Sequence, residues 1–256
     1  MNVIVLLAGL LFLLMTVIGG KKGIRSFVAL FFNFGVIIVT LFFMNVPTIN
    51  PIFLTLIACV LISCINLFYI NKVNRTTKTA FIATIITTVI LVIFITVITN
   101  NAMIQGFGEE ETEELGMFSF YIGLDFIKIA VSVIIMSTIG AITDAAIAIA
   151  SPMREMHYHH PNIERKELFR FGISIGRDIL GTSTNTLFFA FFGSYLALLI
   201  WFKDLSYSVG GIVNSKVFSS EIITICCAAI GVTLVIPITA WITSYFLVRK
   251  EKDSTN

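Results

Sequence analysis

Charged residues are scarce in this sequence. Lys, Arg, Asp and Glu make up 12% of the 256 residues, whereas about a quarter of the residues in a soluble domain are charged. Hydrophobic residues make up 57%, and the mean hydropathy is +0.97. The composition therefore indicates a chain that lies in a lipid bilayer. The net charge of +2 is small, and we expect no nucleic-acid partner.

Cysteine is also rare, and all four cysteines lie in apolar stretches: Cys59, Cys64, Cys226 and Cys227. There they are expected to be small packing residues without a disulfide role. The sequence lacks a nucleophile elbow, a glycine-rich phosphate loop, a zinc motif and a pair of intramembrane aspartates. His157, His159 and His160 stand together without further ligands at metal-binding spacing, so a solvated turn is the expected structure. We therefore expect no enzyme, no metal and no cofactor.

Long apolar runs recur along the whole chain. Each is near the length of about 20 residues that crosses a hydrocarbon core as a helix. An open strand edge has no water to bond in lipid, so helices are expected throughout. The seven runs are residues 2–18, 26–44, 52–70, 80–99, about 126–152, about 176–201 and about 220–248. The predicted fold is all-α, one integral membrane domain over residues 1–256 with about seven spans.

Cationic residues set the expected orientation. Of the 17 Lys and Arg residues, most fall in four groups on one side of such a bundle, which the positive-inside rule makes cytoplasmic. No basic residue precedes the first run, so it is read as a retained span and not as a cleaved signal. The amino terminus is then outside and the carboxyl terminus cytoplasmic. The acidic run from Glu109 to Glu114 falls on the outer side.

Asp144 is an isolated carboxylate inside the fifth apolar run. It precedes Pro152, the expected inner boundary, by about 12 Å of helix, which places it near the midplane. An aspartate at a helix centre costs about 2.5–3.5 kcal/mol on insertion scales, so we expect it to be buried between helices or to face water. One reading is a protonatable group in a transport pathway, and the other is a carboxylate that orders the bundle.

The sixth run carries a polar face. Gly172, Gly176 and Gly181 are expected to let helices approach closely. With Trp201 at the outer aromatic belt, the inner boundary falls near Thr182, and a short surface elbow precedes the span. Arg177 then lies at the headgroups, too far from Asp144 for direct pairing. The intramembrane polar candidates are Asp144, Arg177, Asp178, Thr182, Asn185 and Thr186, with Asn185 and Thr186 the nearest expected partners of Asp144.

The block at about residues 139–199 resembles the signature region of the YibE/F-like family of bacterial multi-pass membrane proteins. The matching positions are Gly140, Asp144, Pro161, Asn162, Glu167, Leu168, Phe169, Gly176, Arg177, Asp178, Gly181, Thr182 and Asn185. A weaker similarity reaches the membrane domain of the SecD/SecF proteins and RND permeases, in which intramembrane polar residues are associated with proton use. In that likeness Asp144 would carry the proton.

The resemblance implies a bacterial plasma-membrane protein, often encoded beside a longer relative with an extracytoplasmic domain. It also implies a homo-oligomer, or a hetero-oligomer with such a relative. From the residues and the resemblance together we expect a permease subunit that uses Asp144, with a proton or a small molecule as substrate. The alternative is a membrane scaffold that assembles a longer family partner without transport.

Overall fold

The computed structural model describes residues 3–46, 48–106, 125–204 and 206–254. All regular structure in these residues is helical, which agrees with the predicted all-α class. The acidic run from Glu109 to Glu114 lies outside the described residues. In chain order the elements are α1 (Val3–Met44), α2 (Pro51–Cys64), the π-helix η1 (Ile65–Tyr69), α3 (Arg75–Ala102), α5 (Phe126–His159), α6 (Arg165–Asp204), α7 (Val209–Asn214) and α8 (Lys216–Ser254).

Within the described residues, five helices are long and apolar enough to cross a membrane: α1, α2 together with η1, α3, α5 and α8. The chain is therefore a membrane protein. The seven predicted runs differ from this number in two places. The first two runs are the two halves of α1, and the sixth lies in α6, which is not among the five. The number of spans thus depends on how α1 and α6 meet the bilayer.

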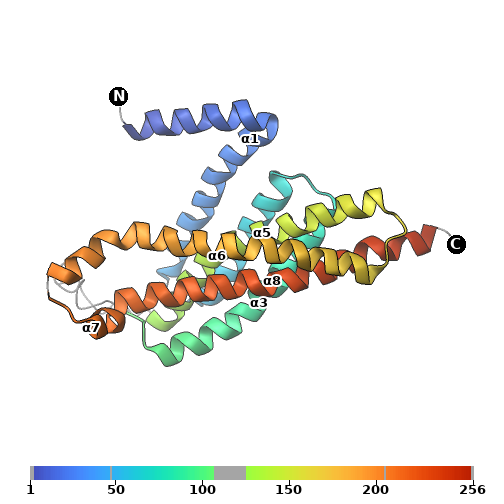
Figure 1. The fold of residues 1–256 in the computed structure, drawn as a ribbon. Helices are drawn as coiled ribbons and strands as arrows, with labels where there is room; N and C mark the ends of the chain where they lie inside the picture. The colour runs from blue at the N-terminus through green and yellow to red at the C-terminus, as the bar shows by residue number, and fades with distance from the viewer. Residues whose placement is uncertain (1–2, 47, 107–124, 205, 255–256) are drawn as a thin grey trace.

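Helix α1 bends sharply at Gly20, where φ is 53° and ψ is −136°. A positive φ suits glycine because it has no Cβ to clash with the backbone. The two halves turn back on each other, and the ring centroids of Phe12 and Phe27 lie 5.0 Å apart. Figure 1 shows the first half standing apart from the rest of the molecule. Its apolar side chains are therefore left for lipid.

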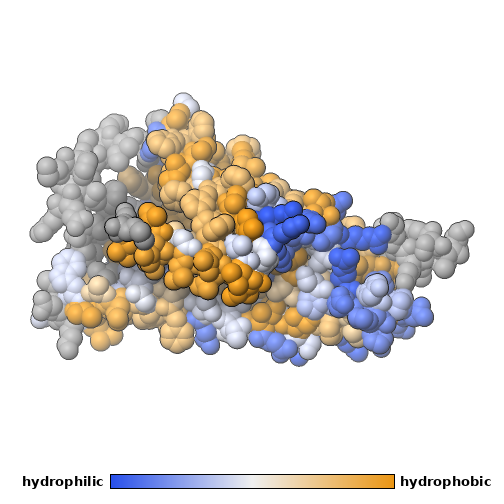
Figure 2. Space-filling view, turned by 90° about the horizontal axis from the view of Figure 1, so that it is seen from above, coloured by the Kyte–Doolittle hydropathy of each residue, from blue (hydrophilic) through white to orange (hydrophobic). Residues whose placement is uncertain are grey.

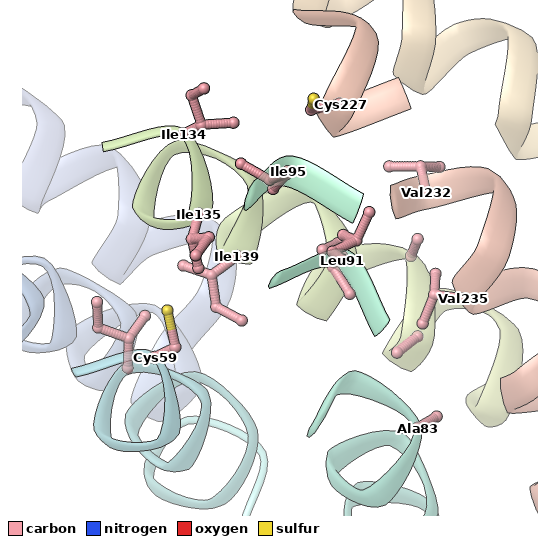
Figure 3. Packing of buried hydrophobic residues seen from close by; sticks show 14 of the residues in the cluster. Cys59, Ala83, Leu91, Ile95, Ile134, Ile135, Ile139, Cys227, Val232 and Val235 are labelled. Atoms are coloured by element: carbon pink, nitrogen blue, oxygen red, sulfur yellow. The ribbon is translucent and has the colours of Figure 1, made fainter. Parts of the chain in front are cut away.

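The core lies between α3, α5 and α8, which run side by side (Figure 1). Figure 3 shows side chains of this core from α2, α3, α5 and α8. Gly231 of α8 allows the closest approach: a Cβ there would lie 2.8 Å from Leu91 Cδ1 and 3.0 Å from Ile142 Cδ1. A glycine at this crossing lets three helices meet, as is usual for helix packing in membranes.

Helix α6 lies along α8, and two glycines make the contact. A Cβ on Gly172 would lie 2.5 Å from Met153 Sδ and 2.9 Å from Ala240 Cβ, and one on Gly176 would overlap Ile236. The Arg165 guanidinium lies 4.8 Å from the centroid of the Tyr245 ring. Arg165 thus begins a helix that packs on α8 from its first turn. Residues 165–171, where a short surface elbow was expected, are the first turns of α6 and not a separate element.

The two ends of the bundle differ in polarity. Figure 2 shows hydrophobic residues over the middle of one face and hydrophilic residues gathered toward the end where the carboxyl terminus lies. The same end holds the loop before α3, with Lys72, and the last turns of α5, with Arg154, which meet around one pocket. Three of the four predicted cationic groups contribute to this end.

Candidate functional site on helices α5 and α6

Asp144 lies on an exposed face of α5. Its neighbours Ile142, Thr143, Ala145 and Ala146 are buried against the core, so the carboxylate points away from α3 and α8. The expectation that it is buried between helices of this chain was therefore wrong. The reason is the register of α5, because helix positions two residues apart lie on nearly opposite faces. Among the described residues Asp144 has no hydrogen-bond or ion-pair partner.

The packing register gives the depth of Asp144. Ile142 lies against Gly231 of α8, and Gly231 precedes Trp241 by ten residues, or about 15 Å of helix. A tryptophan exposed near the cationic end is typical of the membrane interface. Because the hydrocarbon core is about 30 Å thick, a level about 15 Å from the interface is near its middle. Asp144 is two residues from Ile142 and shares that level.

The same register relates α6 to Asp144. Gly172 of α6 contacts Met153 of α5, and the two helices run in opposite directions. Counting nine residues back from Met153 and nine forward from Gly172 places Asp144 about level with Gly181. Arg177 is then only about 6 Å of helix from that level. This register places Arg177 closer to the level of Asp144 than the headgroup position expected from the sequence.

The polar candidates on α6 all lie on the face turned away from α8. Arg177, Asp178, Gly181, Thr182, Asn185 and Thr186 are exposed, and no atom of another residue lies within 4 Å of a Cβ placed on Gly181. The Thr182 hydroxyl donates to Ile179 O at 2.9 Å, and Thr186 donates to Thr182 O at 2.8 Å. Their oxygen lone pairs stay free to accept bonds. We call Asp144 and these exposed residues together the open polar face of α5 and α6.

Two pockets lie at the cationic end of this face. One of about 450 Å³ lies between α5 and the loop before α3, and one of about 620 Å³ lies between α5 and Phe171 of α6. Ser151 and Glu155 line both pockets. Ser151 is seven residues from Asp144, about two helical turns along nearly the same face. Asp144 and Ser151 are therefore exposed on nearly the same side of α5, with only alanine and isoleucine between them.

The histidine cluster lies at the end of α5. His159 Nε2 is 3.1 Å from Glu155 Oε1, one helical turn away, and both side chains are mostly exposed. His157 Nδ1 is buried without a hydrogen-bond partner in the described part of the chain. Within that part, no group of three or more His, Cys, Asp or Glu side chains is arranged to hold a metal ion.

Two polar pairs were missed in the sequence. Asn33 Nδ2 donates to Asn66 Oδ1 at 2.8 Å and joins α1 to the π-helix η1. The Tyr195 hydroxyl donates to Glu221 Oε1 at 2.9 Å and joins α6 to α8 near the opposite end. A carboxamide inside an apolar run is the signal that marks Asn33 and Asn66. Glu221 was not predicted as a polar contact between helices because it lies at the edge of the seventh apolar run.

Comparison with known families covers nearly all of these elements. The family described as YibE/F-like protein matches residues 7–249. The chain belongs to this family. The resemblance first noted at residues 139–199 therefore extends from α1 to the end of α8, and the open polar face is set within a YibE/F-like fold. No curated protein matches the chain. No solved structure matches it either.

Chemically, α5 exposes a carboxylate at about the level at which α6 exposes hydroxyl and amide groups. A carboxylate in such a place can take up and release a proton, or it can bind a cationic group. Neither process requires a metal or a cofactor.

Proposed function

We propose that this chain is a permease subunit of the bacterial plasma membrane, and not an enzyme. In this proposal Asp144 takes and releases a proton or binds a cationic group while α5 and α6 change their packing. The observation that carries the proposal is the exposure of Asp144 near the middle of α5 without a partner in the described structure. Ionisable residues at this depth mark ion and substrate pathways in membrane proteins.

The proposal includes seven spans, with the amino terminus outside and the carboxyl terminus in the cytoplasm. Two spans come from the halves of α1, which reverse direction at Gly20 beside Lys21 and Lys22. The cationic residues at that turn belong to the same side as those around Arg154. With α6 as a further span, the two pockets at the carboxyl-terminal end of α5 open toward the cytoplasm.

Comparison of metabolites inside and outside host cells tests the role of Asp144. The cells carry no copy, the wild type, Asp144→Asn, or Asp125→Asn, at matched membrane abundance. Asp125 is the control because it is a carboxylate at the start of α5 that pairs with Lys128 at 3.0 Å, away from the open face. We expect a compound whose distribution shifts with the wild type and with Asp125→Asn but not with Asp144→Asn. An equal shift of the compound with the wild type, Asp144→Asn and Asp125→Asn would contradict a proton or cation role of Asp144.

A second candidate is an assembly subunit whose open polar face is covered by a longer family member or by a second copy. The exposed polar side chains of α6 support this alternative, because polar groups exposed to lipid are costly. Gly172 and Gly176 do not serve such a partner, since α8 and Met153 already occupy them. The alternative predicts that Gly181→Leu prevents recovery of the complex while Asp144→Asn leaves it intact. Recovery of the intact complex with Gly181→Leu would contradict it.

A further inference from the structure

A second polar site lies at the cationic end of the bundle, apart from Asp144. The pocket of about 450 Å³ is enclosed by the loop that carries Asn71 and Asn74, by the first turn of α3, and by the last turns of α5. Its size suits a small ligand, because ligand pockets are usually about 300–1,000 Å³. Its lining is mostly polar, which distinguishes it from the apolar surface of the spans.

The amino terminus of α3 supplies fixed positive charge to this pocket. Asn74 caps the helix: its Oδ1 accepts from Thr77 N at 2.8 Å, and its own N–H donates to Thr77 Oγ1 at 2.9 Å. Helical geometry leaves the N–H groups of the first turn without partners inside the helix. The Asn74 side chain accepts from the N–H group of Thr77, so the N–H groups of Arg75 and Thr76 stay available to bind a ligand. A helix start of this kind, with aligned peptide dipoles, attracts anions.

Two side chains point independently to a ligand. Thr76 lines the pocket and is 5% exposed, yet its Oγ1 has no hydrogen-bond partner among the described residues. The oxygen itself has almost no accessible surface, so the side chain must turn toward the pocket before a bound group can satisfy it. Leaving a buried hydroxyl unsatisfied costs about 1–3 kcal/mol, and this cost favours the turn when a ligand is bound. Arg154 lines the opposite wall from α5, and it makes no ion pair within the described structure. A guanidinium group without an ion-pair partner suits bidentate binding of a phosphate or a carboxylate.

Glu155 is the one acidic residue in this lining, and it does not cancel the positive charge. Its carboxylate lies 3.1 Å from His159 Nε2, on the side shared with the second pocket. Lys72, Arg75 and Lys78 lie in or beside the segment that forms the opposite wall. Together with Arg154, these cations outnumber Glu155 around the pocket.

We propose that this pocket binds a phosphate-bearing anion, held by Arg154, the Thr76 hydroxyl and the N–H groups at the start of α3. The chemistry is shared by two sources, the headgroup of an anionic phospholipid and a free phosphorylated solute. The site does not depend on the proposed role of Asp144, which precedes Ser151 by about two turns of α5. A result that contradicts one of the two proposals therefore does not contradict the other.

The test uses the purified full chain and two probes. Inorganic phosphate is titrated against thermal unfolding in a neutral detergent, with chloride at matched ionic strength as the reference. In parallel, the chain is placed in phosphatidylcholine nanodiscs with and without phosphatidylglycerol. The variants are Arg154→Gln, Arg154→Lys, Thr76→Val and the control Arg170→Gln, which removes an exposed cation of α6 outside the pocket.

We expect at least one probe to raise the unfolding temperature of the wild type and of Arg170→Gln in a saturable manner. Arg154→Gln should weaken the apparent affinity about tenfold or more, because a charge-assisted pair is lost. The apparent affinity of Arg154→Lys should lie between those of the wild type and Arg154→Gln, because lysine keeps the positive charge but lacks the planar guanidinium group. A response to phosphate identifies a free solute, and a response to phosphatidylglycerol alone identifies a lipid headgroup. Equal responses of the wild type and Arg154→Gln to both probes would overturn the proposal.

Discussion

Two exposed surfaces of this molecule differ in chemistry. The first half of α1 exposes aliphatic side chains, with Val17 at 74% and Ile18 at 84%. The open polar face of α5 and α6 is also exposed, but it carries Asp144, Asp178 and Asn185. Lipid is a good environment for the first surface and a poor one for the second. Exposure alone therefore says little in a membrane protein; exposure of polar groups at membrane depth is what calls for a partner or water.

Each helix of the site also has two unlike faces. On α6, Gly172 and Gly176 are closed in by α8, while Gly181 has no neighbour within 4 Å. The inner face fixes the helix, and the outer face is available for function. The comparison predicts that matched substitutions on the two faces have different effects.

Substitution of Gly176 by leucine should have the largest effect on stability. A Cβ at this position already overlaps Ile236, so a leucine must push α6 away from α8. Overpacking of this kind typically costs about 1–3 kcal/mol. Thermal unfolding in detergent should show a clear loss for Gly176→Leu and little change for the matched variant Gly181→Leu. Equal losses would mean that the two faces of α6 do not differ as described.

Removal of the bond between Asn33 and Asn66 should have the next largest effect. Asn66→Leu leaves the Asn33 carboxamide without its 2.8 Å partner, whereas Asn33→Leu with Asn66→Leu removes both polar groups. Hydrogen bonds between membrane helices average about 0.6 kcal/mol, with values up to about 1.7. Unfolding free energies of the two single variants and the double variant measure the coupling. If the single effects add without coupling, the bond does not hold α1 to η1.

Tyr195→Phe should weaken the contact between α6 and α8 at the other end of the bundle. The variant loses the 2.9 Å hydrogen bond to Glu221 but keeps the ring contact with Phe191, whose centroid lies 5.1 Å away. The expected loss, measured by thermal unfolding, lies at the low end of about 0.5–1.5 kcal/mol, because the bond is only partly buried. Phe192→Leu tests whether ring packing instead accounts for the stability of this end; a larger loss there than in Tyr195→Phe would contradict the expected order.

The smallest effect is expected from Asp125, the residue that caps α5. Its carboxylate pairs with Lys128 at 3.0 Å and accepts from Ile127 N at 3.1 Å. The side-chain bond to Lys128 is the main cause that lowers the pKa of Asp125. A lowered pKa in the folded state stabilises the protein above the unfolded pKa, and this contribution is lost as the pH falls through the folded value.

Asp125→Asn should therefore unfold at a slightly lower temperature than the wild type at neutral pH. The difference should shrink on acidification below the ordinary range of an aspartate. Both side chains of the pair are more than a third exposed, so the effect should also fall as salt is added. A difference that stays constant from neutral to acidic pH would show that the charge of Asp125 contributes nothing.

The general fold followed from the sequence, because apolar runs in lipid leave helices as the main solution. The all-α class and the membrane setting needed only hydropathy. Lys21 and Lys22, which stand between two apolar runs, already indicated a break near the bend at Gly20. The sequence did not predict that the expected elbow is continuous with α6, because the alternation of charged and apolar residues at 163–171 fits a surface helix as well as the start of a long one.

The site was less predictable than the fold. Asp144 could be identified from its type and depth, but which way it faces depends on how α5 packs against α3 and α8. The level of Arg177 depends on contacts of Gly172 with two other helices, which no local pattern contains. The pocket around Arg154 and Thr76 joins segments more than 70 residues apart in the sequence. Tertiary contacts determine such features.

Labelling of a cysteine beside Asp144 tests most directly whether the open polar face meets water. Ala148 is exposed one turn from Asp144, and Leu13 is exposed on the first half of α1. Each is changed to cysteine in a background where the four native cysteines are alanine. A charged methanethiosulfonate reagent should modify Ala148→Cys about tenfold faster than Leu13→Cys or more, because thiolates form where water is present. Equal and slow modification of both would contradict a hydrated path to Asp144.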